Sequence, residues 1–182
     1  MKILGIPGSL RRASLNRALL VTAQELAPEG MELQIADLRP IPLYDADLDD
    51  PAPLAAVEAF KQQIAAADAV LLATPEYNYG IPGVLKNAID WASRPAYRSV
   101  FAGKPCAIVS ASPSPMGGVR AQAQLKVVLL GMAAEVFPYP ELVVPQAQHK
   151  FEGDRLTDPP TREALGKLLG NLALWVGQRR GG

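Results

Sequence analysis

The chain has 182 residues and a formal net charge of zero, with 18 Lys and Arg, 18 Asp and Glu, one His and one Cys. This length is typical of one domain with a self-sufficient core, so we expect residues 1–182 to form a single domain. The balanced charge argues against a nucleic acid or an anionic membrane as partner. Apolar runs are too short for a signal peptide or a membrane span. The single Cys106 excludes an internal disulfide, so we expect a cytoplasmic protein.

Short apolar segments alternate with amphipathic segments along the whole chain. We predict buried strands at 2–6, 32–36, 69–73, 105–109 and, interrupted by Pro138 and Pro140, 134–144. We predict helices around 15–26, 54–67, 85–92 and 125–132, and a last helix that opens at 158–160 and runs through Trp175. A long loop at 37–53 is rich in proline and aspartate, and long loops in compact domains are often functional.

Strands that are apolar on both faces, separated by amphipathic helices, indicate a parallel sheet covered on both sides. With right-handed crossovers, we predict an α/β fold: a doubly wound three-layer α/β/α sandwich around a five-stranded parallel sheet in the order 2-1-3-4-5. In such sheets, ligands bind outside the carboxyl ends of the strands. The loops at 7–16, 75–83 and 110–118 lie there and are rich in glycine, proline, serine and asparagine, so we predict the site on these three loops.

The first of these loops carries groups that suit a phosphate. It leads from a strand into a helix, so backbone N–H groups and the positive end of the helix face an incoming ligand. The hydroxyls of Ser9 and Ser14 and the amide of Asn16 add donors. A guanidinium, from Arg11 or Arg12, adds a charge-assisted hydrogen bond. Neither a dinucleotide-binding nor a P-loop glycine pattern is present. The alternative is a helix cap by Ser14 with solvated arginines.

Four segments together make the chain recognisable. They are GSLRRASLN at 8–16, PEYNYGIPGVLKNAIDW at 75–91, GKP at 103–105 and GG-x-R at 117–120. With these segments the whole chain closely resembles the NAD(P)H-dependent FMN reductase family, which includes bacterial quinone and chromate reductases. The resemblance implies a flavodoxin-like fold that binds FMN.

The resemblance also implies three groups of FMN-binding residues. The phosphate is expected on Ser9, Arg11, Ser14, Leu15 and Asn16. The isoalloxazine is expected along Pro75, Glu76, Tyr77 and Asn78, largely through backbone groups. A third wall is expected from Ala111, Ser112 and Gly117, with the glycine letting the backbone approach closely. For Tyr77 and Tyr79, packing within the turn or against another subunit is the alternative.

The resemblance also implies an activity, that of an FMN-dependent NAD(P)H oxidoreductase. Such an enzyme takes a hydride from the nicotinamide co-substrate and passes electrons to a quinone, flavin, azo or oxyanion acceptor. The flavin itself performs the redox chemistry, so we expect that the protein has no catalytic residue and binds no metal. The relatives are dimers or tetramers, so a homodimer or homotetramer is expected. Residues 37–53, residues 94–101 and the helix containing Arg120 are candidates to contribute from a neighbour.

Two other functions fit the same fold. A flavodoxin-type electron carrier binds FMN without oxidising NAD(P)H, but such carriers are strongly acidic, whereas this chain is neutral and has two arginines on the phosphate loop. A receiver-type signalling module needs an acidic phospho-acceptor at the end of a central strand, where this chain has Thr74 and Pro75. We therefore expect the oxidoreductase.

The remaining conspicuous residues have structural interpretations. The segment 45–50 resembles the opening of an EF-hand loop, but Asp50 takes the sixth position, where glycine is needed. His149 is the only histidine, so neither a histidine metal site nor a catalytic triad is supported. Cys106 falls inside the fourth strand and is expected to be buried and inert. Trp91 is expected in the core.

Overall fold

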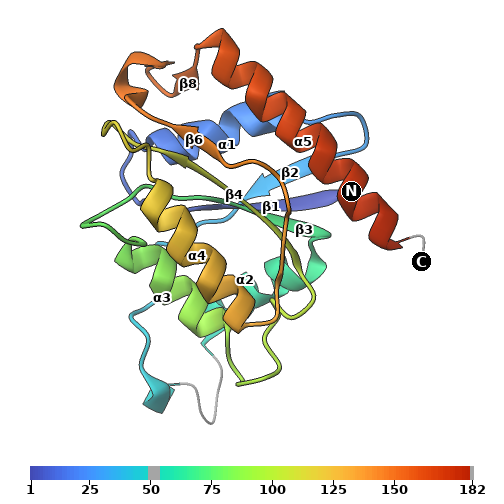
Figure 1. The fold of residues 1–182 in the computed structure, drawn as a ribbon. Coiled ribbons are helices and arrows are strands. Elements are labelled where there is room, and N and C mark those ends of the chain that lie inside the picture. Colours follow the sequence, from blue (N-terminus) through green and yellow to red (C-terminus); the bar gives the residue numbers. More distant parts are fainter. Residues whose placement is uncertain (49–53, 181–182) are drawn as a thin grey trace.

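The computed structural model describes residues 1–48 and 54–180, which form a parallel sheet between two layers of helices (Figure 1). The strands are β1 (Lys2–Pro7), β2 (Glu32–Ile35), β3 (Ala69–Ala73), β4 (Pro105–Ala111), β5 (Glu135–Val136) and β6 (Leu142–Val144). The helices are α1 (Leu15–Glu25), α2 (Ala55–Ala66), α3 (Gly83–Ala92), α4 (Val119–Gly131) and α5 (Pro159–Arg180). The sheet order is β2-β1-β3-β4-β5, with β6 also paired to β4, so the predicted α/β class and strand order are confirmed.

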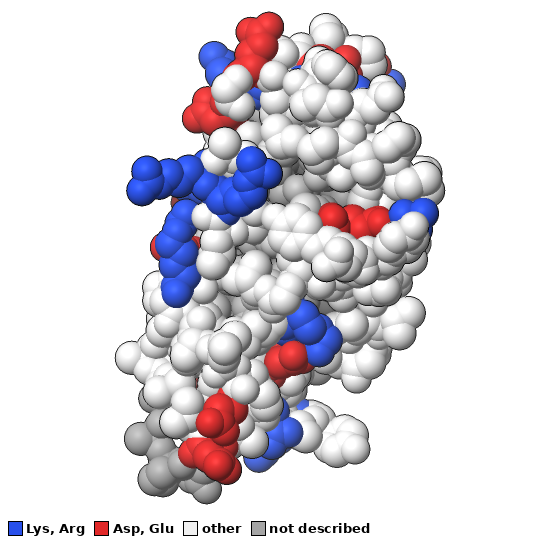
Figure 2. Space-filling view, turned by 90° about the vertical axis from the view of Figure 1, so that its left-hand side faces the viewer, with Lys and Arg blue, Asp and Glu red and all other residues white. Residues whose placement is uncertain are grey.

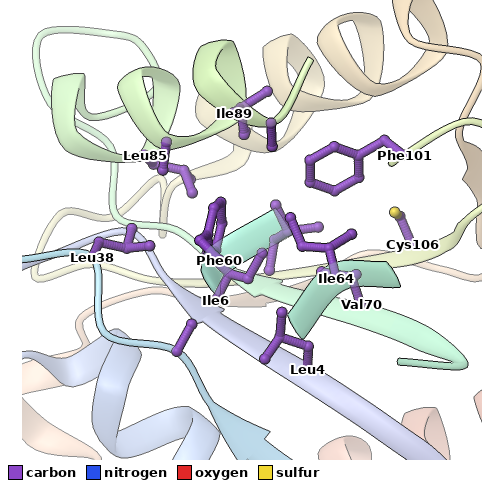
Figure 3. Close-up of a cluster of buried hydrophobic side chains, with 14 of the residues drawn as sticks. Leu4, Ile6, Leu38, Phe60, Ile64, Val70, Leu85, Ile89, Phe101 and Cys106 are labelled. Atoms are coloured by element: carbon purple, nitrogen blue, oxygen red, sulfur yellow. The ribbon is translucent and has the colours of Figure 1, made fainter. Parts of the chain in front are cut away.

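Each face of the sheet is covered by its own hydrophobic core. Helices α1 and α5 cover one face, and α2, α3 and α4 cover the other (Figure 1). In β1, Leu4 and Ile6 belong to the α2–α4 core and Ile3 to the α1–α5 core, because successive side chains of a strand point to opposite faces. Figure 3 shows Phe60 and Ile64 of α2 packed in the first core. Within the described residues, no helix combines the length and the apolar character that crossing a bilayer requires.

Two residues expected in the interior lie there. Trp91 is 1% exposed, and its Nε1 donates to the carbonyl oxygen of Pro42 at 2.9 Å. Cys106 is buried within β4, and this burial raises the pKa of its thiol to about 12. A thiol with so high a pKa stays protonated at neutral pH and is a poor nucleophile.

The segment 134–144 contains two strands. β5 pairs with the start of β4, at Pro105 and Cys106, and β6 pairs with its end, at Val109–Ala111. Between β5 and β6 lie Pro138 and Pro140, which have no N–H group to donate to a sheet. The predicted interruption is confirmed, and it adds a sixth strand to the five that were predicted.

A short hairpin before the last helix was not predicted from the sequence. β7 (Phe151–Glu152) and β8 (Arg155–Leu156) pair antiparallel around a turn in which Gly153 has a φ of +61°. Two-residue strands are too short to show an alternating pattern. Leu156 is 1% exposed and belongs to the α1–α5 core, so the hairpin closes one end of that core.

Candidate active site

The three predicted loops meet at the carboxyl edge of β1, β3 and β4. The N–H of Gly8 donates to the carbonyl oxygen of Ala73 at 2.8 Å, and the N–H of Thr74 donates to that of Val109 at 3.0 Å. Gly8 has little room for a side chain, because a Cβ atom there would lie 3.1 Å from Cδ of Pro75. The sheet therefore brings loops that are far apart in the sequence into contact.

The first loop ends in a helix N-terminus that can bind an anion. The Oγ of Ser14 caps α1 by accepting the N–H of Arg17 at 3.2 Å, so the cap considered as an alternative is present. The N–H groups of Leu15 and Asn16 have no acceptor among the residues that the structure describes. These two N–H groups and the positive end of the helix dipole favour an anion here.

Ser9 and two arginines flank this helix end. The Oγ of Ser9 lies 3.3 Å from the hydroxyl of Tyr77 and accepts the N–H of Arg11 at 3.4 Å. Arg11 and Arg12 are exposed, and neither forms an ion pair with a described residue. Figure 2 faces this edge and shows one group of Lys and Arg side chains at its left, with further charged side chains of both signs elsewhere on this face. The first loop therefore offers both neutral and charged donors.

Asn16 connects the first loop to the third. It is 3% exposed, its Nδ2 donates to the carbonyl oxygen of Ala111 at 2.8 Å, and its Oδ1 accepts the N–H of Ala111 at 2.9 Å. The amide thus satisfies both backbone groups of Ala111 at the end of β4, as a neighbouring strand would. The side chain braces the site from within, and the backbone N–H is left for a ligand.

The second loop contains a tight two-residue turn. The N–H of Tyr77 donates to the carbonyl oxygen of Gly80 at 3.1 Å, and the N–H of Gly80 donates back at 3.0 Å. Between them, Asn78 and Tyr79 have φ values of 49° and 67°, as in hairpin turns with two left-handed residues. The N–H of Tyr77 is therefore occupied. Within the described chain, the N–H groups of Glu76 and Asn78 have no acceptor.

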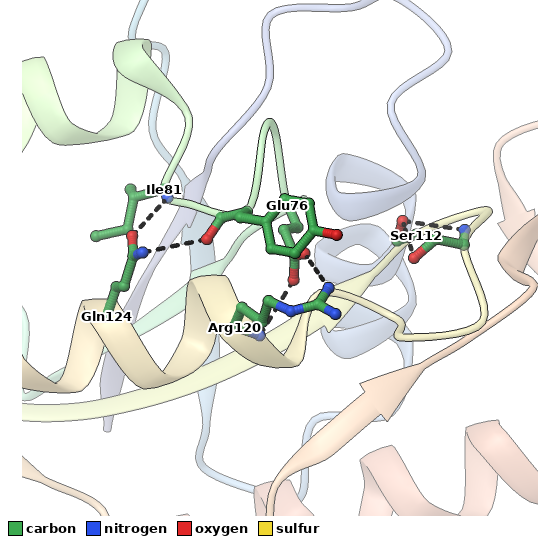
Figure 4. A network of polar contacts seen from close by, with 7 residues as sticks. Glu76, Ile81, Ser112, Arg120 and Gln124 are labelled. Carbon is green, nitrogen blue, oxygen red and sulfur yellow. Dashed lines mark hydrogen bonds and ion pairs between the residues drawn. The ribbon is translucent and has the colours of Figure 1, made fainter.

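The carboxylate of Glu76 is held by Arg120 at the start of α4 (Figure 4). It accepts the backbone N–H of Arg120 at 3.1 Å and its Nη1 at 2.9 Å, and the Glu76 side chain is only 9% exposed. The guanidinium of Arg120 also lies 4.3 Å from the ring centroid of Tyr79. The helix containing Arg120 was predicted to contribute to a neighbouring subunit, and this stays a prediction; the contacts of Arg120 with Glu76 and Tyr79 lie within its own chain.

The third loop is shaped by close packing. The N–H of Ser112 donates to the carbonyl oxygen of Val144 at 3.1 Å, and the N–H of Gly117 donates to that of Ser114 at 3.2 Å. Gly117 has a φ of +60°, and a Cβ atom there would lie 2.3 Å from Cγ1 of Val143. In the structure, this glycine is required by its close approach to β6, and its contact with a ligand stays a prediction.

Metal-binding arrangements are absent from the described part of the chain. Its His, Cys, Asp and Glu side chains form no group of three or more that is placed to hold a metal ion. The aspartate-rich segment at 45–50 extends into residues 49–53, which lie outside the described residues. His149 is exposed at the end of a short 3₁₀ helix (Ala147–His149). The candidate site therefore consists of hydrogen-bond donors and one ion pair.

Comparison with known proteins identifies the family. The model of the family described as NADPH-dependent FMN reductase matches residues 1–149. The chain belongs to this family. It is 47% identical to an NAD(P)H-dependent FMN reductase of Pseudomonas aeruginosa, over 100% of this chain and 98% of that protein. It is 40% identical to a 2-hydroxy-1,4-benzoquinone reductase of a Burkholderia species, over 99% and 98% of the two chains.

A solved structure agrees with this assignment. FerB, a flavoenzyme NAD(P)H:(acceptor) oxidoreductase of Paracoccus denitrificans, has the same fold as this protein, with a TM-score of 0.86. The two are 35% identical, and the match covers 97% of each chain. The resemblance seen in the sequence and the flavodoxin-like fold it implies are thereby confirmed.

The donors on the first and second loops fit the FMN that the name of this reductase family implies. A phosphate monoester with about two negative charges needs several donors and a cation. The first loop has the N–H groups at the start of α1, the Ser9 hydroxyl and the arginines. A flat ring with a polar edge needs a few donors on a rigid wall. The turn in the second loop has the N–H groups of Glu76 and Asn78.

Arg120 and Gln124 are site residues that the sequence analysis did not assign. Both lie on α4 and both contact the turn of the second loop. Their spacing of four places them on one face of a helix, and this helix follows the third loop. The sequence did contain a signal for this contact. Glu76 lies in the second loop, Arg120 follows the third loop, and both loops lie at the same edge of the sheet, so the acid and the arginine could have been predicted to pair.

Asn16→Ala is expected to lower the free energy of unfolding of the protein without FMN by about 2–4 kcal/mol. The reason is that both backbone groups of Ala111 lose their partner in a buried position. Urea denaturation followed by tryptophan fluorescence measures the change. Gln24→Ala removes a hydrogen bond from an exposed residue of the same helix to the carbonyl oxygen of Leu33 and is the control. Equal losses in the two variants would contradict the bracing role.

Proposed function

We propose that this protein is an FMN-dependent oxidoreductase that takes a hydride from NADH or NADPH and passes electrons to a small-molecule acceptor such as a quinone. The observation that carries the proposal is the first loop. Its helix N-terminus, the Ser9 hydroxyl and two exposed arginines lie at the sheet edge where such folds bind ligands. Relatives named as an FMN reductase and as a benzoquinone reductase support the same chemistry.

In this proposal the first loop holds the phosphate of FMN. The donors are the N–H groups of Leu15 and Asn16, the hydroxyl of Ser9 and the guanidinium of Arg11. Ser14 keeps the helix start in place through its cap on Arg17. A hydrogen bond to a charged group contributes about 1.5–3 kcal/mol, so these donors supply a large part of the affinity.

The other two loops hold the isoalloxazine. Pro75 and the N–H groups of Glu76 and Asn78 form one wall, and Ala111 at the end of β4 and Ser112 after it form another. When bound, FMN supplies the two-electron chemistry. The chain contributes proximity, which is worth up to about 7–11 kcal/mol when two reactants are held in register. The carboxylate of Glu76 is engaged by Arg120, so the proposal assigns no acid or base to the protein.

Anaerobic reduction tests the proposed activity. Protein loaded with FMN is expected to lose its visible flavin absorbance within seconds when NADH or NADPH is added under argon, and to regain it when a benzoquinone is added. Free FMN at the same concentration is the control and reacts much more slowly, because it lacks the bound nicotinamide. Retention of the oxidised spectrum with both nucleotides would instead identify a flavodoxin-type carrier.

Arg11→Ala is expected to weaken FMN binding about ten- to a hundredfold, because one charge-assisted hydrogen bond to the phosphate is lost. Quenching of FMN fluorescence on titration measures the Kd. Riboflavin, which has no phosphate, should bind the variant and the wild type equally. Arg12→Ala, measured beside it, shows which arginine faces the phosphate. An unchanged Kd for Arg11→Ala removes that residue from the proposed phosphate site.

We also propose that the protein assembles as a homodimer or homotetramer through α3 and α4. On α4, Val127 and Leu130 are 69% and 62% exposed. Val127 also lines a hollow of about 620 Å³ between α3, α4 and the second loop, to which Tyr77 and Ile81 contribute. Burying this apolar surface between copies would be favourable. It would also place residues of a partner subunit next to the flavin site.

Val127→Arg is expected to shift the molecular mass measured by light scattering towards that of the monomer, because a charge would enter the proposed interface. Leu174→Arg is the matched control, since Leu174 is 67% exposed and lies on α5, on the other side of the sheet. A wild-type protein that is entirely monomeric at micromolar concentration would contradict the proposed assembly.

A further inference from the structure

The first two turns of α4 hold the turn of the second loop. Arg120 makes the contacts with Glu76 and Tyr79 described above. One helical turn later, Nε2 of Gln124 donates to the carbonyl oxygen of Tyr79 at 3.1 Å, and its Oε1 accepts the N–H of Ile81 at 3.2 Å. Figure 4 shows both side chains reaching from α4 to this loop. We refer to the contacts of Arg120 and Gln124 as the α4 clamp.

The α4 clamp supports a backbone conformation that the residues themselves do not favour. Tyr79 has a φ of 67°, in the left-handed region that is unfavourable for a residue with a Cβ atom. Gly80 completes the turn, and a Cβ atom there would lie 2.9 Å from Oε1 of Gln124. Such conformations persist where surrounding contacts over-determine them. The contacts of Arg120 and Gln124 do so here.

The α4 clamp also neutralises an acid beside the site. The Glu76 side chain is 9% exposed, and Arg120 is its cationic partner. A Glu76 carboxylate that stays ionised after losing its cationic partner would make the site more negative. A more negative site disfavours the addition of electrons to a bound flavin, because like charges repel at close range. The charge of the site therefore depends on Arg120.

We propose that Arg120 and Gln124 are positioning residues for the flavin. They hold the turn at 76–81 in one conformation before FMN binds, and Arg120 sets the charge of the site through Glu76. The inference rests on the proposed function, in which this turn is a wall of the isoalloxazine pocket. With the turn held, the free N–H groups of Glu76 and Asn78 have fixed directions, which lowers the entropy lost on binding.

Hydrogen exchange of the protein without FMN tests the positioning. Arg120→Met keeps an unbranched side chain and removes its charge and donors. In this variant the hydrogen-bonded amides of Tyr77, Gly80 and Ile81 are expected to exchange about tenfold faster than in the wild type, because the turn opens locally. The amides of β1 and β3 should keep their rates, which distinguishes local opening from general loss of stability.

Lys126→Met is the matched control for this experiment. It removes an ion pair with Glu141 from the same helix without touching the second loop, so the exchange of 76–81 should be unchanged. Gln124→Ala should also speed exchange, because the carbonyl oxygen of Tyr79 and the N–H of Ile81 lose their partner. Wild-type exchange rates in both Arg120→Met and Gln124→Ala would overturn the positioning role.

The midpoint potential of bound FMN tests the charge effect. Arg120→Met is expected to lower this potential, since Glu76 loses its cation. Arg120→Lys keeps the charge and should restore the potential. It should restore the exchange rates only in part, because an ammonium lacks the planar group that stacks on Tyr79. An unchanged potential in Arg120→Met would overturn the electrostatic part of the proposal.

A double variant separates the two effects. With Glu76→Gln added to Arg120→Met, both charges are gone, so the potential should return towards the wild-type value while exchange of the turn stays fast. A potential that stays low would refute the role of the Glu76 charge. Failure of the wild-type protein to bind FMN would refute the proposed function, whereas exchange measured without FMN would still decide whether the α4 clamp holds the turn.

Discussion

The two hydrogen bonds between the Asn16 side chain and the backbone of Ala111 join the first helix to the end of β4. Within the sheet, backbone hydrogen bonds between neighbouring strands hold each strand in place. Beyond the strand ends, the backbone groups need hydrogen-bond partners from elsewhere. Asn16 provides such a partner at the point where the first and third loops leave the sheet. The position of the helix N-terminus relative to the rest of the site depends on this contact.

Single hydrogen bonds and side-chain contacts hold the second loop at the same edge of the sheet. The N–H of Gly8 donates to the end of β3, and the Ser9 hydroxyl lies beside that of Tyr77, so the first loop and the turn touch directly. From the other side, Arg120 and Gln124 reach the turn from α4. A displacement of α1 or α4 would therefore move the free N–H groups on which the proposed flavin site relies.

Most side chains of the site act on the protein itself. Ser14 caps a helix, Asn16 braces a strand end, and Gln124 satisfies two backbone groups of the turn. The groups left for a ligand are mainly backbone N–H groups and exposed guanidinium groups. Backbone donors on a rigid loop lose little entropy when they bind, which suits a protein that holds a cofactor and leaves the chemistry to it.

Much of the fold could be predicted from local patterns. Apolar runs such as 69–73 and helical spacing in 15–26 are set by neighbouring residues, and the parallel order follows from strands that are buried on both faces. The break at Pro138 and Pro140 could be predicted because proline lacks an N–H group. The hairpin at 151–156 could not, because strands of two residues have no periodicity.

The sequence by itself determined which loops lie at the carboxyl edge and that the chain resembles the FMN reductases. It also showed that the first loop carries hydrogen-bond donors of the kind that suits a phosphate. The tertiary structure alone decided which of those donors are free. The side-chain amide of Asn16 is bonded to Ala111, 95 residues away, and the carboxylate of Glu76 is paired with Arg120, 44 residues away. Local sequence specifies a residue's chemistry and its position along an element. Whether its hydrogen-bonding groups are occupied depends on segments that only the packed sheet and helices bring together.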